Sequence, residues 1–276
     1  MAADGELLGK WRADLAAWAI PAHITAAVAD SPWVLPRDVF ARRADRLMAE
    51  PAGASYERER EALEPAGTVL DIGSGAGAAC LPLVPYATTI TAVDSDADML
   101  TLLAERATAA GPDLRTVRGG WPDVAAQVAP ADVVTCHHVL YNVPDLGPFL
   151  TALTGHARRR VVVELTAAHP LVSLNPLWLR FHGLQRPDVP TAADLLAILA
   201  EAGVRAGHTE WSRPAEADYA GFAELVDVTR RRLCLPADRA SEVEAALLDL
   251  GSQRERPGDL GSSERDVVTI WWEGAA

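Results

Sequence analysis

The residues of this 276-residue sequence that could do chemistry begin with an acid and a run of glycines. Asp71 ends a short apolar stretch, and Gly73, Gly75 and Gly77 follow it at alternate positions. Glycine lets the backbone turn sharply and approach a ligand closely, often at the start of a helix, which we expect to begin near Ala78. The pattern predicts a buried strand that leads into a nucleotide-type binding loop.

A second acid narrows the choice of ligand. Asp94 ends the next apolar run, roughly 20 residues beyond the loop, where a carboxylate can accept hydrogen bonds from ribose hydroxyls. NAD and S-adenosylmethionine both carry such a ribose. Asp71 favours S-adenosylmethionine, because a carboxylate beside the loop would repel the pyrophosphate of a dinucleotide. An NAD(P)-dependent oxidoreductase stays open as the alternative.

At these residues the sequence resembles the class I S-adenosylmethionine-dependent methyltransferases of the small-molecule type. Their first motif is an acid followed by three spaced glycines, which Asp71 and the loop provide. The resemblance continues over about 65–165, through a helix start at 95–100, an adenine-side loop at 119–121 and a fourth strand at 131–136. One departure is Gly120, which stands where many members carry an aspartate. Adenine recognition would then depend on backbone groups and Trp121.

The resemblance implies S-adenosylmethionine as cofactor, with S-adenosylhomocysteine as its product, and it implies where the cofactor lies. Asp94 would hold the ribose, although it and Ser95 could instead cap a helix. Trp121 could equally be part of the core. The cofactor-binding residues that we expect are Asp71, Gly73, Ser74, Gly75, Gly77, Asp94, Ser95, Met99, Gly120, Trp121, Cys136 and His137.

The segment after the fourth strand best indicates where the methyl acceptor, the molecule that receives the methyl group, would bind. If it forms a helical turn, His138, Tyr141 and Asn142 share one face and bind substrate. Neutral His138 could take a proton from a hydroxyl or amine acceptor near pH 7, or could simply orient a neighbour. Related ubiquinone-pathway O-methyltransferases carry Glu, Glu and His at these three places, which can bind a metal. His and Tyr replace both carboxylates here, so we expect no metal.

The acceptor is less well defined than the cofactor. Trp33, Trp178 and Phe181 are expected to line an apolar pocket, although each could be a core residue instead. A hydrophobic or aromatic small molecule is the acceptor that such a pocket favours, methylated at oxygen, nitrogen or carbon by in-line displacement. A non-catalytic protein that binds S-adenosylmethionine is the second alternative, because its cofactor motifs would look the same.

The composition of the chain limits the kinds of partner that we expect it to bind. The formal charge of −13 argues against nucleic acid, whose phosphates are bound mainly by Lys and Arg. The three cysteines lie far apart without metal-site or disulfide spacing, and no apolar run reaches the roughly 18 residues of a membrane span. We therefore expect a cytoplasmic protein with no membrane or nucleic-acid partner, and the sequence leaves its oligomeric state open.

An α/β fold would bring the expected site residues together. Strands near 68–72, 89–93, 114–118, 131–136 and 160–165 alternate with helices such as 97–109, which predicts a parallel sheet. The resemblance adds a Rossmann-like, seven-stranded sheet with helices on both faces and an antiparallel last strand at 266–272. Thr191 and Ser241 each fit a capping box. We expect an N-terminal helical cap over 1–64 and a methyltransferase domain over 65–276, with insertions at 168–190 and 213–262.

Overall fold

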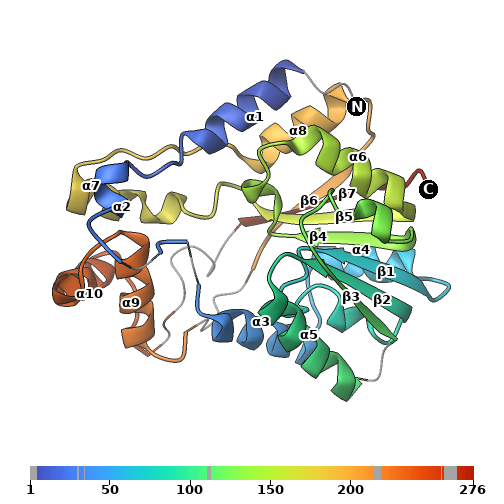
Figure 1. The fold of residues 1–276 in the computed structure, drawn as a ribbon, viewed down its shortest axis with the longest axis horizontal. Coiled ribbons are helices and arrows are strands. Elements are labelled where there is room, and N and C mark those ends of the chain that lie inside the picture. The colour runs from blue at the N-terminus through green and yellow to red at the C-terminus, as the bar shows by residue number, and fades with distance from the viewer. Residues whose placement is uncertain are drawn as a thin grey trace.

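A single twisted sheet organises the chain, and the computed structural model describes residues 5–29, 31–33, 35–110, 113–213, 219–255, 257 and 266–276. The seven strands follow the order β3-β2-β1-β4-β5-β7-β6 (Figure 1). β7 is antiparallel to both of its neighbours, and the other pairs are parallel. The predicted fold class is confirmed. The strands are β1 (Gly67–Ile72), β2 (Ala87–Asp94), β3 (Leu114–Arg118), β4 (Ala131–His137), β5 (Ala157–Thr166), β6 (Gly207–Ser212) and β7 (Asp266–Glu273).

Helices cover both faces of the sheet. One apolar core joins the sheet to α1, α6 and α8, and another joins the opposite face to α4 and α5. A third cluster fills a lobe beside the sheet that contains α2, α7, α9 and α10 (Figure 1). The helices are α1 (Glu6–Ala16), α2 (Ala22–Thr25), α3 (Arg37–Ala49), α4 (Ala54–Ala62), α5 (Ala97–Ala110), α6 (Leu146–His156), α7 (Asn175–His182), α8 (Ala192–Glu201), α9 (Phe222–Arg232) and α10 (Ala240–Asp249).

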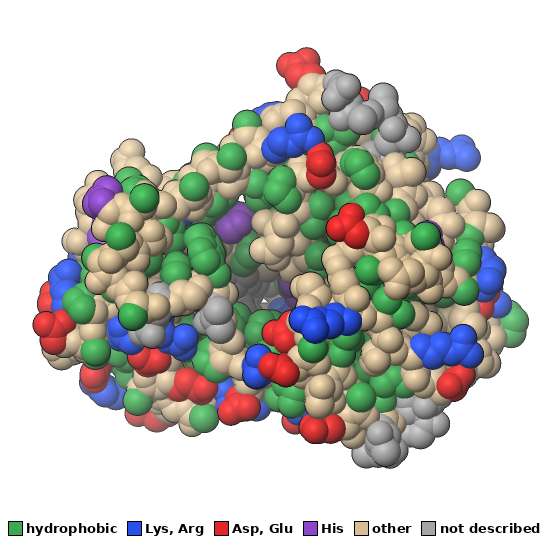
Figure 2. Space-filling view, in the orientation of Figure 1, with side chains coloured by type: hydrophobic (Ala, Val, Ile, Leu, Met, Phe, Trp, Pro, Cys, Tyr) green, Lys and Arg blue, Asp and Glu red, His purple; other side chains and the backbone are tan. Residues whose placement is uncertain are grey.

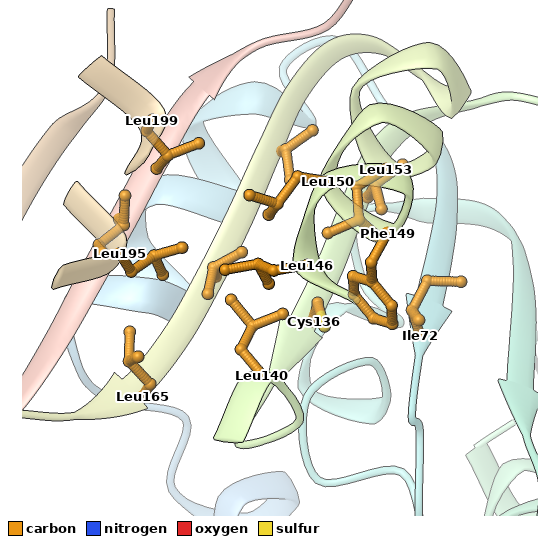
Figure 3. Packing of buried hydrophobic residues seen from close by; sticks show 14 of the residues in the cluster. Ile72, Cys136, Leu140, Leu146, Phe149, Leu150, Leu153, Leu165, Leu195 and Leu199 are labelled. Atoms are coloured by element: carbon orange, nitrogen blue, oxygen red, sulfur yellow. The ribbon is translucent and has the colours of Figure 1, made fainter. Parts of the chain in front are cut away.

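The largest core holds the carboxyl end of β4 in place. Leu146, Phe149 and Leu150 of α6 and Leu195 of α8 pack with Cys136 of β4 (Figure 3). Burying a leucine or phenylalanine side chain contributes roughly 1.5–3 kcal/mol, so this cluster fixes α6 and α8 firmly on the sheet. The loop that leaves β4 therefore starts from a rigid base.

The α-helix expected after the glycine loop is absent, and that prediction was wrong. Residues 73–80, all described, form turns, and only a 3-10 helix, Leu81–Leu83, precedes β2. Pro82 and Pro85 explain the difference, because proline lacks an N–H and clashes with the preceding turn of an α-helix. α3 and α4 contact this 3-10 helix instead. The sheet face that a longer helix would cover is thus covered by the N-terminal helices.

The two expected capping boxes had different outcomes. The Thr191 hydroxyl and the Asp194 carboxylate form a reciprocal box at the start of α8, which confirms the first. The second was wrong, because the 3-10 turn Ala237–Arg239 leads directly into α10 and places Ser241 inside the helix. The domain boundary at residue 64 stays a prediction, and α4 on its N-terminal side packs against β4, β5 and β7.

Candidate functional site

The glycine loop after β1 uses all three of its glycines in the left-handed region, with φ of 70° at Gly73, 51° at Gly75 and 93° at Gly77. A side chain at Gly73 would collide with Val139, and one at Gly77 would collide with Leu81, at 2.3 and 2.6 Å. A Cβ at Gly75 would meet nothing within 4 Å. Two glycines therefore serve packing, and the third leaves open space beside the backbone.

Asp94 connects this loop to α5. Its Oδ2 accepts a hydrogen bond from the Gly75 N–H at 2.8 Å, and its Oδ1 accepts one from the Asp96 N–H at 2.8 Å. A carboxylate has more lone-pair sites than these two bonds occupy, so Asp94 can still accept from a ribose. Ser95 is exposed next to it, whereas Met99 is buried against the loop.

Asp71 lies buried beneath the loop. Neither of its oxygens has a hydrogen-bond partner, and the same is true of Ser74 Oγ and Trp121 Nε1. Burial raises the pKa of Asp71 to about 7, although the Cys80 thiol and His137 oppose the shift. Buried polar atoms without partners carry a large desolvation cost, so a polar ligand that reaches them would gain affinity.

The remaining residues expected around the cofactor differ in their exposure. Trp121 is partly buried with its ring edge-on to His156, at 4.8 Å between centroids, and Gly120 is exposed beside it. Cys136 has no exposed surface, and its side chain points into the α6 core (Figure 3). Only the backbone of Cys136 is left for a ligand.

His138 leaves β4 in an unusual conformation. Its φ of 58° is in the left-handed region, which residues other than glycine seldom adopt. Its N–H donates to the backbone oxygen of Glu164 at 2.7 Å, and its Nε2 lies 2.9 Å from Glu164 Oε1. The following residue, Val139, packs on Gly73 of the glycine loop. His138 is therefore fixed between the loop and the end of β5.

Glu164 is the central buried carboxylate. Its Oε2 accepts a hydrogen bond from Ser55 at 2.7 Å, and its Oε1 is shared by His138 and the guanidinium of Arg213. Burial alone would raise the pKa of Glu164, but Arg213 and His137 outweigh it and hold the pKa well below its usual range. Glu164 is therefore ionised at neutral pH.

His137 faces the other side of the same network. Its Nε2 lies 2.8 Å from Glu59 Oε1, an ion-pair distance without hydrogen-bond alignment. Burial lowers its pKa, but the carboxylates of Glu59 and Glu164 overcome that effect and raise the pKa to about 9. Glu59 also accepts a hydrogen bond from Thr135. A charged His137 thus balances acids that come from α4 and β5.

A cavity of about 580 Å³ opens on the acceptor side of His138. Figure 2 shows the hollow between the α7–α9–α10 lobe and the sheet, with histidine side chains visible inside it. His138, Tyr141 and Asn142 all line it, as does Trp33, so the structure brings these four together. Its other apolar lining includes Leu15, Trp18, Leu35, Phe40 and Leu171.

Two residues expected in this pocket lie elsewhere. Trp178 is 3% exposed inside the lobe, and Phe181 is partly buried against the same cluster. Neither is among the residues that line the cavity, so the expectation that they wall it was wrong. Their helix, α7, faces α9 and α10 because its apolar positions complete the lobe's own core.

Sequence reasoning missed several residues that do line the cavity or support it. Trp18 stacks on His169 at 3.9 Å, and Trp18 Nε1 donates to the Val189 oxygen at 2.6 Å. The sequence did contain a pattern that could have identified Glu164, because it is an acid at the end of a buried strand, as Asp71 is. The others had none, because they come together only through packing of distant segments. The missed residues are Trp18, Ser55, Glu59, Glu164, His169, Arg43, Arg213 and Arg232.

The comparisons with known proteins agree with this geometry. The family model described as a methyltransferase domain matches residues 69–159, the segment from β1 through the start of β5. Residues 69–159 are a methyltransferase domain. A search of curated proteins found no match.

Solved structures share the fold of this chain at low identity. The YcgJ protein from Bacillus subtilis is 18% identical, with a TM-score of 0.50, and the alignment covers 78% of this chain and 99% of that one. Magnesium protoporphyrin IX methyltransferase from Synechocystis PCC 6803, determined with S-adenosylhomocysteine bound, is 15% identical with a TM-score of 0.51, over 86% and 84% of the two chains.

The residues around the loop fit the cofactor of this family, S-adenosylmethionine. The open space at Gly75 can admit a ligand, and the buried oxygens of Asp71 provide acceptors without partners. Among the described residues, no cluster of three or more His, Cys, Asp or Glu is arranged to hold a metal ion. None of the helices in the described ranges has the length and hydropathy of a membrane crossing.

Proposed function

We propose that this methyltransferase transfers the methyl group of S-adenosylmethionine to a small molecule in the 580 Å³ cavity, and that His138 accepts the proton of the acceptor. One observation carries the proposal. His138 lines the cavity, is followed by a residue packed on the glycine loop, and is held by a buried carboxylate. It therefore lies where the two ligands of a methyl transfer would meet.

In this proposal the cofactor lies along the loop. Gly75 gives it room, Asp94 accepts from the ribose hydroxyls, and Asp71 provides acceptor oxygens below. The other residues proposed around it are Gly73, Ser74, Gly77, Ser95, Met99, Gly120, Trp121, His137 and the backbone of Cys136. When bound, the cofactor supplies an electrophilic methyl group on sulfur, and no acid or base is needed to release it.

The protein's own contribution is to hold the acceptor and take its proton. With the ring proton of His138 on Nε2, which lies 2.9 Å from Glu164 Oε1, Nδ1 would be the basic nitrogen. Desolvation of the imidazole, Arg213 and His137 lower the pKa of His138 against the raising effect of Glu164, so the imidazole is neutral at pH 7. The side chain is 40% exposed, so the desolvation is incomplete and the direction of the shift is what counts. A carboxylate that orients a histidine base is a recurring arrangement in acyl-transfer enzymes as well.

Tyr141 and Asn142 would position the acceptor beside this base. The Tyr141 hydroxyl donates to the Thr166 oxygen at 2.7 Å, so its ring is fixed and offers a flat apolar wall. Trp11 stacks behind it, with ring centroids 5.9 Å apart. Asn142, on the same 3-10 turn, Leu140–Asn142, brings an amide to the cavity. The acceptor would thus be held by one rigid aromatic and one polar contact.

A His138→Asn variant tests the base. Asparagine tolerates the left-handed backbone of this position, so the variant removes the imidazole with little added strain. We expect kcat on an oxygen or nitrogen acceptor, found by screening small aromatic and aliphatic molecules, to fall roughly 10²- to 10⁴-fold. Calorimetric titration with S-adenosylhomocysteine should give the same affinity as the parent protein. Unchanged turnover would remove His138 from the mechanism.

The pH profile gives a second readout. Because the pKa of His138 lies below the ordinary value of 6.5, the parent enzyme should keep its kcat as the pH falls to about 6. The fall at lower pH should report protonation of the base, and it should be missing in the residual activity of His138→Asn. A parent profile that falls already above pH 7 would contradict the assignment.

A further inference from the structure

Two polar side chains interrupt the apolar runs of neighbouring strands. Glu164 follows three valines in β5, and Thr269 lies between Val268 and Ile270 in β7. The two polar residues are direct partners in the antiparallel β5–β7 pair, so their side chains lie next to each other on one face of the sheet. Thr269 has no exposed surface, and Glu164 is almost fully buried. Buried polar groups need hydrogen-bond partners, so this face of the sheet must supply them.

A chain of hydrogen bonds across three strands and one helix supplies these partners. Trp211 Nε1 of β6 donates to Thr269 Oγ1 at 2.9 Å. Thr269 Oγ1 lies 2.7 Å from Ser55 Oγ of α4, and the Ser55 hydroxyl donates to Glu164 Oε2 at 2.7 Å. α4 packs against β5 and β7, which brings Ser55 to this face of the sheet. The four residues therefore form one continuous chain from β6 to β5.

The hydrogen bonds of this chain can run in one direction only. The indole N–H of Trp211 is a donor, and the ionised carboxylate of Glu164 is an acceptor. Ser55 has one hydroxyl proton, which it gives to Glu164, so Thr269 must give its own proton to Ser55. Each bond therefore polarises the next one towards the carboxylate, and such a chain is stronger than its separate bonds.

The chain fixes the direction of the Glu164 carboxylate. Rotation about the last bond of a glutamate side chain is only loosely restricted, so a carboxylate without partners would turn easily. Ser55 holds Oε2 on the α4 side, and Oε1 is thereby directed towards His138, 2.9 Å from its Nε2. Arg213 donates to the same Oε1. The orientation of Glu164 therefore depends on a hydroxyl that does not line the acceptor cavity.

The two neighbours of His138 Nε2 favour opposite tautomers. Glu164 Oε1 is an acceptor and favours a proton on Nε2. Arg213 Nη1, 3.4 Å from Nε2, is a donor and favours a lone pair there. The carboxylate is the closer of the two, so it determines the tautomer as long as Oε1 keeps its direction. A carboxylate that turned away would leave the choice to Arg213.

We propose that Ser55 and Thr269 are positioning residues for His138, and that they hold it in the tautomer with its proton on Nε2. This tautomer leaves Nδ1 as the nitrogen that can take a proton from the methyl acceptor. The inference rests on the proposed function and deepens it, since it concerns the control of the same histidine. Neither positioning residue lines the acceptor cavity, so each acts through Glu164.

Nuclear magnetic resonance tests the tautomer directly. Long-range ¹H–¹⁵N correlation spectra of protein labelled with ¹⁵N-histidine distinguish a ring nitrogen that carries a proton from one that carries a lone pair. The chain has seven histidines, and the His138 signals are those that disappear in His138→Asn. At about pH 8 the imidazole is neutral, because the pKa of His138 is lowered. The parent should then show His138 with its proton on Nε2.

Four variants test the hydrogen-bond chain. Ser55→Ala removes the donor to Glu164 and should shift His138 towards the tautomer with its proton on Nδ1. Thr269→Val keeps the shape of the side chain without its hydroxyl and should cause a smaller shift in the same direction. Thr269→Ser restores the hydroxyl and should give the parent spectrum. Thr229→Val is the matched control, because it removes a buried threonine hydroxyl in α9, outside this chain.

Turnover gives a second readout, on an acceptor found in the screen described for His138→Asn. We expect kcat to fall about tenfold in Ser55→Ala, because one hydrogen bond to a charged group is lost, and severalfold in Thr269→Val. KM and the affinity for S-adenosylhomocysteine should stay within about twofold of the parent values, because neither residue contacts a ligand in this proposal. Unchanged cofactor affinity also shows that the variants are folded.

The proposal is overturned if the parent carries the His138 proton on Nδ1, or if Ser55→Ala and Thr269→Val both give the parent spectrum. A shift of equal size in Thr229→Val or Thr269→Ser would also overturn it, since the cause would then be a general loss of packing. If Ser55→Ala does not fold, the two Thr269 variants decide alone. Full turnover in His138→Asn would remove the proposed base, yet the parent spectrum would still test the tautomer, so the two proposals fail separately.

Discussion

The cofactor side and the acceptor side of His138 are built in different ways. One short stretch, from Asp71 to Met99, supplies the glycine loop, the ribose carboxylate and the start of α5. The acceptor cavity takes its walls from α3, α9, the segment after β4, the segment after β5 and residues near β6 and β7. Local sequence therefore determines the first region, and packing of distant segments determines the second.

The difference shows which region tolerates change. A loop held by left-handed glycines and one carboxylate has few alternatives, since Gly73 and Gly77 have no room for a side chain. The cavity walls are separate helices whose side chains can change without altering the sheet. Members of this family with the same cofactor can therefore differ in acceptor, because function depends on the site more than on the fold.

Glu164 joins the two regions, and its loss should have the largest effect. In Glu164→Ala the Arg213 guanidinium, 19% exposed, loses its carboxylate, Ser55 loses an acceptor, and His138 loses the carboxylate 2.9 Å from its Nε2. Breaking such a buried pair costs about 3–5 kcal/mol of unfolding free energy, which urea denaturation would measure. Glu164→Gln keeps the shape and one acceptor oxygen, so its loss should be smaller. A loss below about 1 kcal/mol in the alanine variant would show that the two regions are independent.

The stability of the free protein should fall between pH 7 and 9. The folded-state pKa of His137 is raised to about 9 from 6.5, so its contribution is complete below pH 6.5 and is lost as the pH rises through 9. The expected decrease is about 2 kcal/mol over that interval. Urea denaturation across the range measures it. The His137→Gln variant should be less stable than the parent at pH 7, and its unfolding free energy should hardly change between pH 7 and 9. If its unfolding free energy fell as steeply as that of the parent, another group would be responsible for the titration.

The substitution Gly75→Ala tests the cofactor-binding region alone. Gly75→Ala adds a Cβ that meets no protein atom, so the fold loses only the roughly 1–2 kcal/mol of a left-handed alanine. If the cofactor lies there, S-adenosylhomocysteine affinity should fall about tenfold or more, which is about 1.4 kcal/mol. Gly183→Ala is the control, with φ of 61° and equally open space at the end of α7. Equal affinities in the two variants would move the cofactor away from Gly75.

Trp33 tests the acceptor side alone and should have the smallest effect on the fold. Its side chain lines the cavity but the residue is 56% exposed, so Trp33→Ala should change the unfolding free energy by less than about 0.5 kcal/mol. Binding of an acceptor should weaken severalfold, with cofactor affinity unchanged. Trp178→Ala is the contrast, because this buried ring should cost about 3–5 kcal/mol. A large stability loss at Trp33 would make it a structural residue.

Sequence predicted the fold better than the site. Alternating strands and helices predicted the parallel sheet, because each element has its own apolar pattern, and the family resemblance predicted the antiparallel last strand. The helix after the loop was predicted wrongly, since Pro82 and Pro85 outweigh the usual preference. Trp178 was placed in the pocket because a bulky apolar side chain looks the same in sequence whether it fills a core or lines a cavity. Arg213 and His169 became visible only once β5, β6 and the N-terminal segment were packed together.

The left-handed backbone at His138 also limits how this position can vary among natural homologues and in directed evolution. Glycine, asparagine, aspartate and histidine adopt that conformation at tolerable cost, and branched residues do not. In a saturation library at codon 138, these few amino acids should therefore give the most stable clones, and most others should cost roughly 1–2 kcal/mol. New activities would have to arise from the surrounding walls, with this codon nearly constant.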